Sequence, residues 1–341
     1  MMSDQKTGVI ESNVLATEQD EELLLSTLRA QSWAEFSGQE KVKTSLQIAI
    51  TAAKQRHEAL DHTLLYGPPG LGKTTLSHLI AKEMGVHLRI TSGTALAKTG
   101  DLAAILTSLE PGDVLFIDEI HRLPKAVEET LYPVMEDYAL DIVLGKGPSA
   151  RTVRLDLPKF TLVGATTRFG LLTGPFRDRF GLIHRMEFYN HVGLTKILMH
   201  ASQKLNVELS PAAAMAIAER ARGTPRISLK LLKRVRDYSQ VHGQASITDT
   251  SVVNALDMLC IDPLGLDDPD RQFLRLIIDK HNGGPVGIST IAATVREDPG
   301  TIEEVIEPFL LQIGFLKRTP QGRVVTKKAY QHLQIAYPDT M

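Results

Sequence analysis

A phosphate-binding loop is the clearest chemical pattern in the chain. Residues 67–74 read Gly-Pro-Pro-Gly-Leu-Gly-Lys-Thr, which fits the spacing Gly-x-x-x-x-Gly-Lys-Thr. Glycines let backbone N–H groups point inward at phosphate oxygens, and the helix N-terminus that follows adds a positive field. We expect Lys73 to reach the β- and γ-phosphates of a nucleotide and the Thr74 hydroxyl to hold Mg²⁺. The alternative is a glycine-rich turn with an incidental lysine.

A pair of carboxylates, Asp118-Glu119, directly follows the apolar run Val114-Leu115-Phe116-Ile117. An acidic residue at the carboxyl end of a parallel strand lies beside the phosphate loop. We expect Asp118 to orient Mg²⁺ and its waters, and Glu119 to polarise an attacking water. A second carboxylate favours hydrolysis over simple nucleotide binding, whereas the alternative is an ordinary acidic pair at the surface.

Several polar side chains further along suit a γ-phosphate. The apolar run 160–165 ends in Thr166-Thr167-Arg168, and Arg177 and Arg179 follow. One alternative for these two arginines is a set of surface ion pairs. The other is an arginine finger that reaches the ATP of a neighbouring subunit, because a positive charge there stabilises the transition state. Arg226 could couple nucleotide state to the angle between domains.

Short apolar strands that alternate with amphipathic helices would position these side chains. We predict strands over 62–66, 114–117 and 160–165 and a helix over 73–84. Buried strands separated by helices indicate a parallel sheet with right-handed crossovers, and so an α/β domain.

The rest of the chain divides into two smaller domains. Helical spacing with no strand candidate between indicates a small all-helical domain, with helices over 195–205, 211–221, 227–241 and 249–259. A linker at 262–265 precedes a winged-helix domain, with helices over 269–281, 289–295 and 301–312 and a hairpin over 314–318 and 323–326. Thr301 and Glu304 predict a capping box at the third of these helices. We therefore predict domains at 1–189 (with 1–25 mostly a mobile arm), 190–260 and 263–341.

Composition excludes several classes of protein. The 341 residues carry 38 Lys+Arg against 40 Asp+Glu, a net charge of −2, so any nucleic-acid surface must be a local patch. Cys260 is the only cysteine, which excludes an intrachain disulfide and a cysteine zinc cage. With no apolar run long enough to span a membrane and no secretory core at the start, we expect a cytoplasmic protein without a membrane partner.

A basic patch occurs at the C-terminal end. Residues 312–341 hold five cationic side chains against Asp339, a net charge of +4, and the cations are Lys317, Arg318, Arg323, Lys327 and Lys328. Such a wing suits phosphate contact without sequence reading. The alternative is a solvated basic tail.

Together these patterns resemble the AAA+ ATPases, and most closely the Holliday-junction branch-migration motors of bacteria. The resemblance runs from about Leu28 to Leu333, and its specific stretches are 62–75, 116–123, 131–138, 160–168, 177–181 and 314–323. It implies an AAA+ P-loop parallel-sheet domain, a small all-helical lid domain and a C-terminal winged-helix domain. It also implies ATP and Mg²⁺ as cofactors. Where the family usually has an arginine before the third winged-domain helix, this chain has Pro299.

The resemblance implies roles residue by residue. Those in the ATPase cycle are the phosphate loop (Gly70, Lys73, Thr74, Thr75), the Walker B pair (Asp118, Glu119), the first sensor (Thr167), the trans-acting finger (Arg179) and the second sensor (Arg226). The residues implied around the base are Leu28, Arg29 and Tyr189. A segment implied to line the nucleotide site consists of Glu136, Asp137 and Tyr138. The DNA-contacting wing is implied to use Arg318 and Arg323.

The resemblance also implies partners. Alternating residues over 140–144 and 151–155, around Gly145-Lys146-Gly147-Pro148, independently predict a hairpin. In the family a hairpin in this place docks a RuvA-type junction-binding protein, and the alternative is an ordinary solvated hairpin. Double-stranded DNA, four-way junctions, a RuvC-type resolvase and self-assembly into a hexameric ring are the other implied partners.

Two other functions remain open from the sequence. A clamp-loader-type switch would open a protein ring, but such loaders typically end in a helical collar rather than a winged domain. A nucleotide-gated regulator would read an operator, but the helix 301–312 carries Glu303, Glu304 and Glu307 and nothing placed to read bases. The leading hypothesis is an ATP-driven, ring-forming DNA translocase that drives branch migration.

Overall fold

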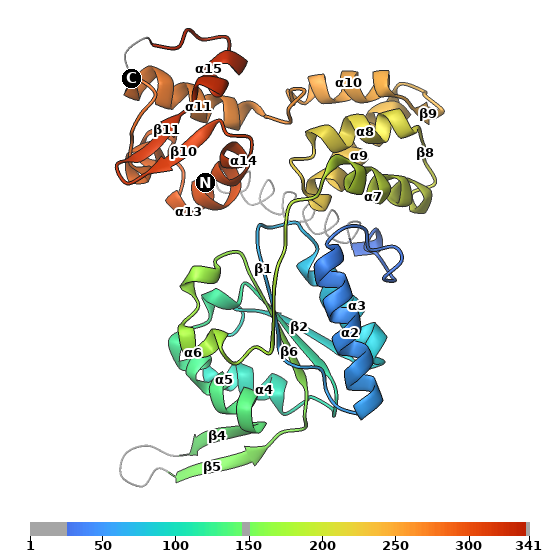
Figure 1. Cartoon of the computed structure of the whole chain (residues 1–341), viewed down its shortest axis with the longest axis vertical. Helices are drawn as coiled ribbons and strands as arrows, with labels where there is room; N and C mark the ends of the chain where they lie inside the picture. The colour runs from blue at the N-terminus through green and yellow to red at the C-terminus, as the bar shows by residue number, and fades with distance from the viewer. Residues whose placement is uncertain (1–25, 145–150, 339–341) are drawn as a thin grey trace, which may run out of the picture. The chain divides into compact units, whose positions relative to one another are not determined.

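The computed structural model describes residues 26–144 and 151–338 and divides into two compact units, one up to Tyr189 and one from Asn190 (Figure 1). The expected N-terminal arm, the turn at 145–148 and Asp339 lie outside the described residues.

A five-stranded parallel sheet forms the centre of the first unit, with strand order β2-β3-β6-β1-β7. The strands are β1 (Thr63–Tyr66), β2 (Leu88–Ser92), β3 (Val114–Asp118), β6 (Thr161–Thr166) and β7 (Leu182–Arg185). The sequence predicted the three inner strands, and the parallel α/β sheet is confirmed. It missed β2 and β7, whose exposed positions interrupt the apolar run that marks a buried strand.

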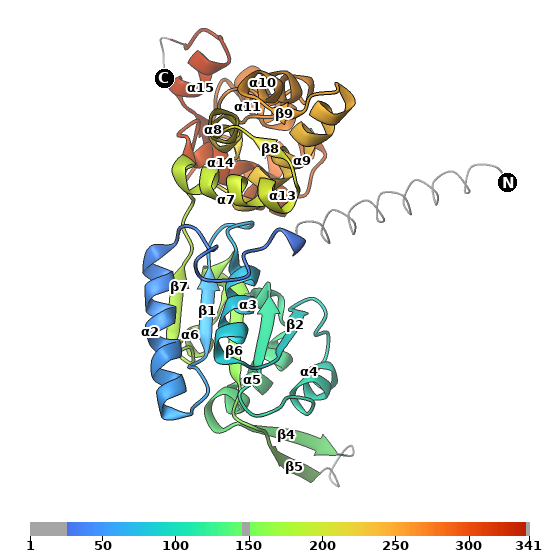
Figure 2. The same cartoon turned by 90° about the vertical axis from the view of Figure 1, so that its right-hand side faces the viewer.

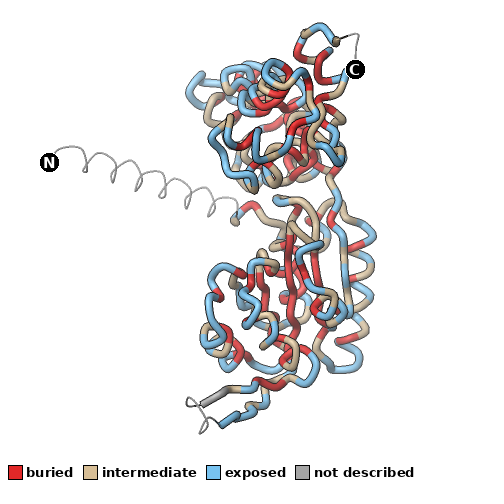
Figure 3. The backbone as a smooth tube through the Cα atoms, turned by 90° about the vertical axis from the view of Figure 1, so that its left-hand side faces the viewer, coloured by how far each residue is buried: buried red, intermediate tan, exposed pale blue. Residues whose placement is uncertain are grey.

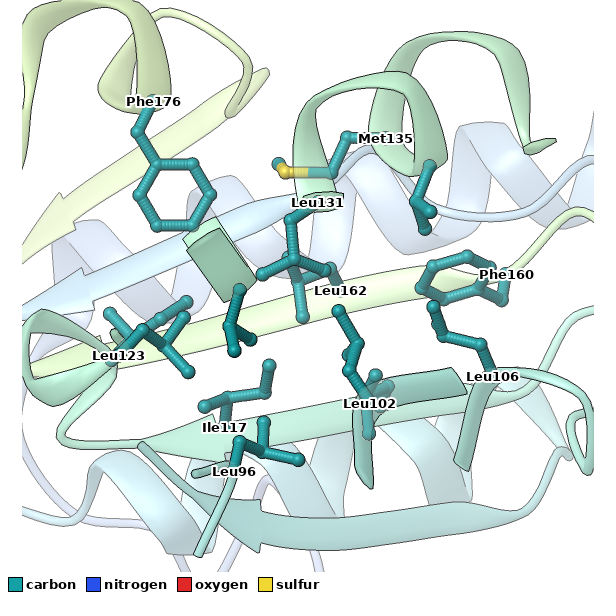
Figure 4. Packing of buried hydrophobic residues seen from close by; sticks show 14 of the residues in the cluster. Leu96, Leu102, Leu106, Ile117, Leu123, Leu131, Met135, Phe160, Leu162 and Phe176 are labelled. Atoms are coloured by element: carbon teal, nitrogen blue, oxygen red, sulfur yellow. The ribbon is translucent and has the colours of Figure 1, made fainter. Parts of the chain in front are cut away.

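Helices cover both faces of this sheet. On one face lie α2 (Glu40–Arg56) and α3 (Lys73–Met84), and on the other lie α4 (Thr99–Leu106), α5 (Lys125–Asp137) and α6 (Gly174–Arg177) (Figure 2). Side chains alternate along each strand, so the sheet contributes to a core on each side, and the inner strands form the buried centre of the unit (Figure 3). Figure 4 shows one such core, where residues of α4, α5 and α6 pack on β3 and β6.

The predicted hairpin is confirmed as the antiparallel pair β4 (Ala139–Leu144) and β5 (Arg151–Asp156). Leu140 is buried, and Ile142 and Leu155 pack against the core of Figure 4. Val153 on β5 is 39% exposed although it is aliphatic. The hairpin is therefore anchored at its base and offers an apolar side chain to solvent.

The second unit begins with the four predicted helices, α7 (His191–Lys204), α8 (Pro211–Arg220), α9 (Pro225–Val241) and α10 (Asp249–Met258). Ser210 caps α8 by accepting a hydrogen bond from the Ala213 N–H. The expectation that no strand interrupts them was wrong in one detail. The segments β8 (Glu208–Leu209) and β9 (Ser246–Ile247) form a parallel pair of two residues each, which is too short to leave a periodic signal.

A winged-helix fold completes the unit. Its elements are α11 (Asp268–His281), α12 (Ile288–Val295), α13 (Pro299–Thr301), the π-helical turn η4 (Ile302–Ile306), α14 (Glu307–Gln312), β10 (Leu316–Thr319), β11 (Gly322–Val325) and α15 (Lys327–His332). The predicted Thr301 capping box was wrong. Asp298 caps instead, accepting from the Gly300 N–H, because the following Pro299 favours the first helical turn.

Two features are absent from the part of the chain that the structure describes. No helix there is both long and apolar enough to cross a bilayer. Across 26–144 and 151–338, no group of three or more His, Cys, Asp or Glu side chains could by itself hold a metal ion.

Candidate nucleotide site and nucleic-acid interface

The phosphate loop lies between the end of β1 and the start of α3, as its chemistry requires. Gly67, Gly70 and Gly72 have φ values of 142°, 76° and 98°, which side chains rarely tolerate. A Cβ on Gly67 would stand 2.5 Å from the Met186 carbonyl oxygen. Glycine is therefore required for both the conformation and the packing of the loop.

Lys73 opens α3 and is buried. Its ammonium donates hydrogen bonds to the carbonyl oxygens of Gly67 and Pro68, at 2.8 and 2.9 Å. Burial lowers the pKa of Lys73, and the nearby carboxylates of Asp118 and Glu119 oppose that shift. The lysine is thus held inside its own loop by two carbonyls, which phosphate oxygens can replace.

The residues present fit Mg²⁺. Thr74 offers a hydroxyl at the first turn of α3, and Asp118 ends β3 with a half-buried carboxylate whose Oδ1 accepts from the Glu119 N–H at 2.9 Å. Hard oxygen donors are what Mg²⁺ takes, and it usually keeps waters and substrate phosphates as its other ligands. Two oxygen-bearing side chains are therefore sufficient on the protein side.

The Glu119 carboxylate is held by two partners. Its Oε2 accepts a hydrogen bond from the Thr167 hydroxyl at 3.1 Å and lies 3.2 Å from Nδ1 of His121. The same His121 nitrogen lies 2.9 Å from the Thr166 hydroxyl, and the His121 side chain is only 4% exposed. The ends of β3 and β6 thus bring the proposed base and the proposed first sensor into direct contact.

Two of the three residues expected around the base contact the loop or α3. The Tyr189 hydroxyl donates to the Leu71 carbonyl at 3.3 Å, and burial raises the pKa of Tyr189. A Cβ on Gly38 would stand 2.6 Å from the Tyr189 ring. Leu28 is buried, and Arg29 Nη1 lies 3.3 Å from Nε2 of His78 on α3.

Sequence reasoning missed one support of this corner. The side-chain amide of Gln39 donates to the Glu187 carbonyl at 2.6 Å and accepts from the Glu187 N–H at 3.2 Å. This pair ties the segment before α2 to the segment that carries Tyr189. A single glutamine gives no motif, so only the fold reveals it.

Arg179 lies at the other end of the strands. Its Nη2 pairs with Glu136 at 3.1 Å, its Nη1 donates to the Pro175 carbonyl at 2.6 Å, and it stacks 4.3 Å over the Tyr132 ring. The chain then enters β7, where Leu182 pairs with Thr63 at the start of β1. The phosphate loop follows the far end of β1, roughly 10 Å further along the strand direction.

The segment Glu136-Asp137-Tyr138 lies near Arg179 and away from the chain's own loop. Tyr138 packs on His62 and Phe160, which precede β1 and β6, at 5.9 Å between ring centroids in both cases. Asp137 pairs with Arg154 of the hairpin at 2.8 Å. The structure does not bring these three residues to the chain's own phosphate loop.

Two further predicted residues are Arg226, which belongs to the second unit, and Thr75, which belongs to the first. Arg226 is exposed in the first turn of α9, and its part in the site stays a prediction. Thr75 follows Thr74 in α3 and is half-buried.

The two arginines of the wing face each other across its hairpin, since Arg318 on β10 pairs in register with Arg323 on β11. Both form ion pairs with Glu307 of α14, which is fully buried. Arg323 also pairs with Glu303 at 3.0 Å. The Arg318 side chain is 49% exposed and that of Arg323 only 13%, so the two are not equivalent.

Comparison with known proteins agrees with this arrangement. Family models match in order: the Holliday junction DNA helicase RuvB P-loop domain over 28–186, the RuvB AAA lid domain over 189–262 and the RuvB C-terminal winged helix domain over 263–334. The chain is 56% identical over 323 residues to the RuvB subunit of the Holliday junction branch migration complex of Chloroflexus aggregans, which covers 95% of this chain and 92% of that protein.

Solved structures are also similar. The Thermotoga maritima RuvB Holliday junction branch migration motor superposes with a TM-score of 0.85 at 52% identity, covering 92% of this chain and 100% of that one. A variant of the same motor gives 0.84 at 51% identity, covering 91% and 99%.

Proposed function

The chain belongs to the RuvB family of Holliday-junction branch-migration motors, and on this premise we propose how its residues drive that activity. The chain is an AAA+ ATPase, and its ATP site lies at the carboxyl ends of β1, β3 and β6. Gly70, Lys73, Thr74 and Thr75 hold the nucleotide phosphates, with Leu28, Arg29 and Tyr189 around the base and Arg226 as the second sensor.

Hydrolysis in this proposal depends on Glu119. Thr74, and Asp118 through water, hold Mg²⁺, which when bound neutralises charge on the β- and γ-phosphates. Glu119 orients the attacking water and accepts its proton. The hydrogen bond from Thr167 supports this role, because it links the base to the residue placed to sense the γ-phosphate.

Arg179 acts on the neighbouring subunit. The observation that carries this proposal is its place at the amino end of β7, opposite the chain's own phosphate loop. From there its guanidinium reaches a γ-phosphate only in a second copy of the chain, where it stabilises transition-state charge. Glu136, which pairs with Arg179, and the adjacent Asp137 and Tyr138 line the same neighbour's site.

The ring and its partners complete the motor. We propose a closed ring, since each ATP site needs the next subunit's Arg179, and six subunits because the family resemblance implies a hexamer. The hairpin 139–156 docks a RuvA-type junction-binding protein, and a RuvC-type resolvase joins at the junction. The winged domain contacts the backbone of double-stranded DNA without reading sequence, and Arg318 and Arg323 belong to that surface.

Mixing two inactive variants tests the trans arrangement. Arg179→Ala keeps its phosphate loop, and Lys73→Ala keeps its finger. Alone, each should lose ATP hydrolysis. A mixture should regain part of it, because an intact loop then meets a neighbour's intact finger. A mixture as inactive as its components would show that Arg179 does not act across subunits.

A further inference from the structure

A buried carboxylate lies behind the DNA-facing wing. Arg318 and Arg323 stand opposite each other on β10 and β11, an arrangement in which like charges repel. Glu307 of α14 has no exposed surface and lies between their guanidinium groups. A buried ionised carboxylate is stable only with cationic partners and hydrogen bonds, and the two arginines supply both.

The two arginines use this carboxylate differently. Arg318 donates from Nε, at 2.8 Å, and from Nη2 to the same oxygen, Oε2 of Glu307. Arg323 donates from Nε to Oε1 of Glu307 at 2.5 Å and from Nη2 to Glu303 at 3.0 Å. The hydrogen bond to Glu307 raises the pKa of Arg323 despite its burial. Arg323 is thus committed to two carboxylates, whereas Arg318 is committed to one and remains half exposed.

We propose that Glu307 is a positioning residue of the DNA-binding wing. It holds the Nε–Nη2 side of Arg318 and so directs Nη1 toward a phosphodiester of duplex DNA. Arg323 is the inner counter-ion that keeps Glu307 ionised. The inference rests on the proposed function of the wing as a contact to the DNA backbone.

A charge-removing substitution at Glu307 distinguishes positioning of Arg318 from general electrostatic attraction to DNA, because the two effects change binding in opposite directions. Glu307→Gln removes a negative charge from a DNA-binding surface, so electrostatic attraction alone would tighten binding. Loss of positioning weakens binding instead, because Arg318 is no longer fixed. Glu303→Gln is the matched control, since it removes the same charge from a partly exposed position that does not touch Arg318.

The test is binding of the full chain to a labelled mixed-sequence duplex, by fluorescence anisotropy across a salt series, with a non-hydrolysable ATP analogue and Mg²⁺. Arg318→Ala should weaken binding about tenfold at 0.1 M salt and reduce the log–log salt slope by about 0.9, the value for one phosphate contact. Glu307→Gln should reproduce both changes. The variant that combines Arg318→Ala with Glu307→Gln should lose no more DNA affinity than either single variant, because both changes remove the same contact. Glu303→Gln should bind as tightly as the wild type or more tightly.

Folding is followed by thermal melting of each variant. If Glu307→Gln does not fold, Glu307→Leu with Arg323→Leu replaces the buried pair by apolar groups, a change that such sites often tolerate. That variant should show the loss of at least one phosphate contact. Wild-type binding by it would overturn the proposal. Tighter binding by folded Glu307→Gln would also overturn it. A wild-type chain whose duplex binding ignores salt would instead refute the wing's role in the proposed function.

Discussion

Glu119 is the residue on which the proposed hydrolysis depends most. It has a φ of 45°, and its carboxylate is held by Thr167 with His121 close by. If Thr167 is the first sensor, as proposed, this hydrogen bond ties the Glu119 carboxylate to the state of the γ-phosphate position. The proposed role of Glu119 as a base therefore depends on its contacts with Thr167 and His121.

Glu119→Gln keeps the shape of the side chain but removes its ability to accept a proton. We expect ATP hydrolysis to fall by about 100-fold or more, with nucleotide binding retained. Steady-state phosphate release and binding of a fluorescent ATP analogue measure the two effects. The exposed Glu129→Gln on α5 is the control and should leave both unchanged. A normal rate in Glu119→Gln would remove it as the base.

The residues of the phosphate loop could be predicted from sequence because each performs its function within one short motif. Gly70, Lys73 and Thr74 need no distant partner to be recognised. The role proposed for Glu307 could not be predicted, because it depends on the burial of this helix residue between the arginine side chains of two strands. From the sequence it looked only like a residue unsuited to face phosphates, and its contact with Arg318 is a product of the fold.

Among the strands of the central sheet, those that are buried were the ones that the sequence predicted. The inner strands β1, β3 and β6 are continuous apolar runs, so their pattern was visible. The edge strands β2 and β7 alternate or mix exposed positions and left no such run. The ladder they join is formed by backbone groups, which the sequence does not display.

The hairpin β4–β5 carries a prediction at the same scale. Val153 is exposed on β5, beside residues that anchor the hairpin to the core. Val153→Glu should weaken binding of a RuvA-type partner at least several-fold, because a charge would have to be buried in the contact. Basal ATP hydrolysis should not change. Pull-down titration and phosphate release measure these, and unchanged partner binding would exclude this strand as the docking surface.

The start of α11 carries a prediction about pH. Arg222 Nη2 lies 2.8 Å from both Asp267 and Asp270. Burial raises the pKa of Asp270 from 3.8 to about 7, against the opposing effect of Arg222. The folded chain therefore holds a proton that the unfolded chain releases between these values. The free energy of unfolding should fall as pH rises through this window, and the loss is complete above about 7.

Asp270→Asn removes the titrating group. Denaturant unfolding of the second unit, followed between pH 5 and 8, should show a weaker pH dependence in this variant than in the wild type. The exposed Asp268→Asn is a suitable comparison on the same turn, since its pKa is lowered by its hydrogen bond with Arg271. Identical pH profiles for Asp270→Asn and the wild type would contradict the assignment.

For the whole molecule, the central claim of the proposed function is that one chain does not complete its own active site. The phosphate loop, the proposed Mg²⁺ ligands and Glu119 lie at one end of the strands, and Arg179 with Glu136 lies at the other. A single chain is therefore expected to bind ATP but not to hydrolyse it efficiently. Composition and periodicity do not predict this incomplete site, because it depends on strand direction and on a second copy of the chain.

The most direct measurement is ATP-dependent dissociation of a synthetic four-way DNA junction, with and without a RuvA-type partner. The wild-type chain should separate the arms only with ATP, and faster with the partner. Arg179→Ala should bind ATP yet leave the junction intact under both conditions. Dissociation by Arg179→Ala at the wild-type rate, or ATP hydrolysis by the wild type without movement of the junction, would contradict this account.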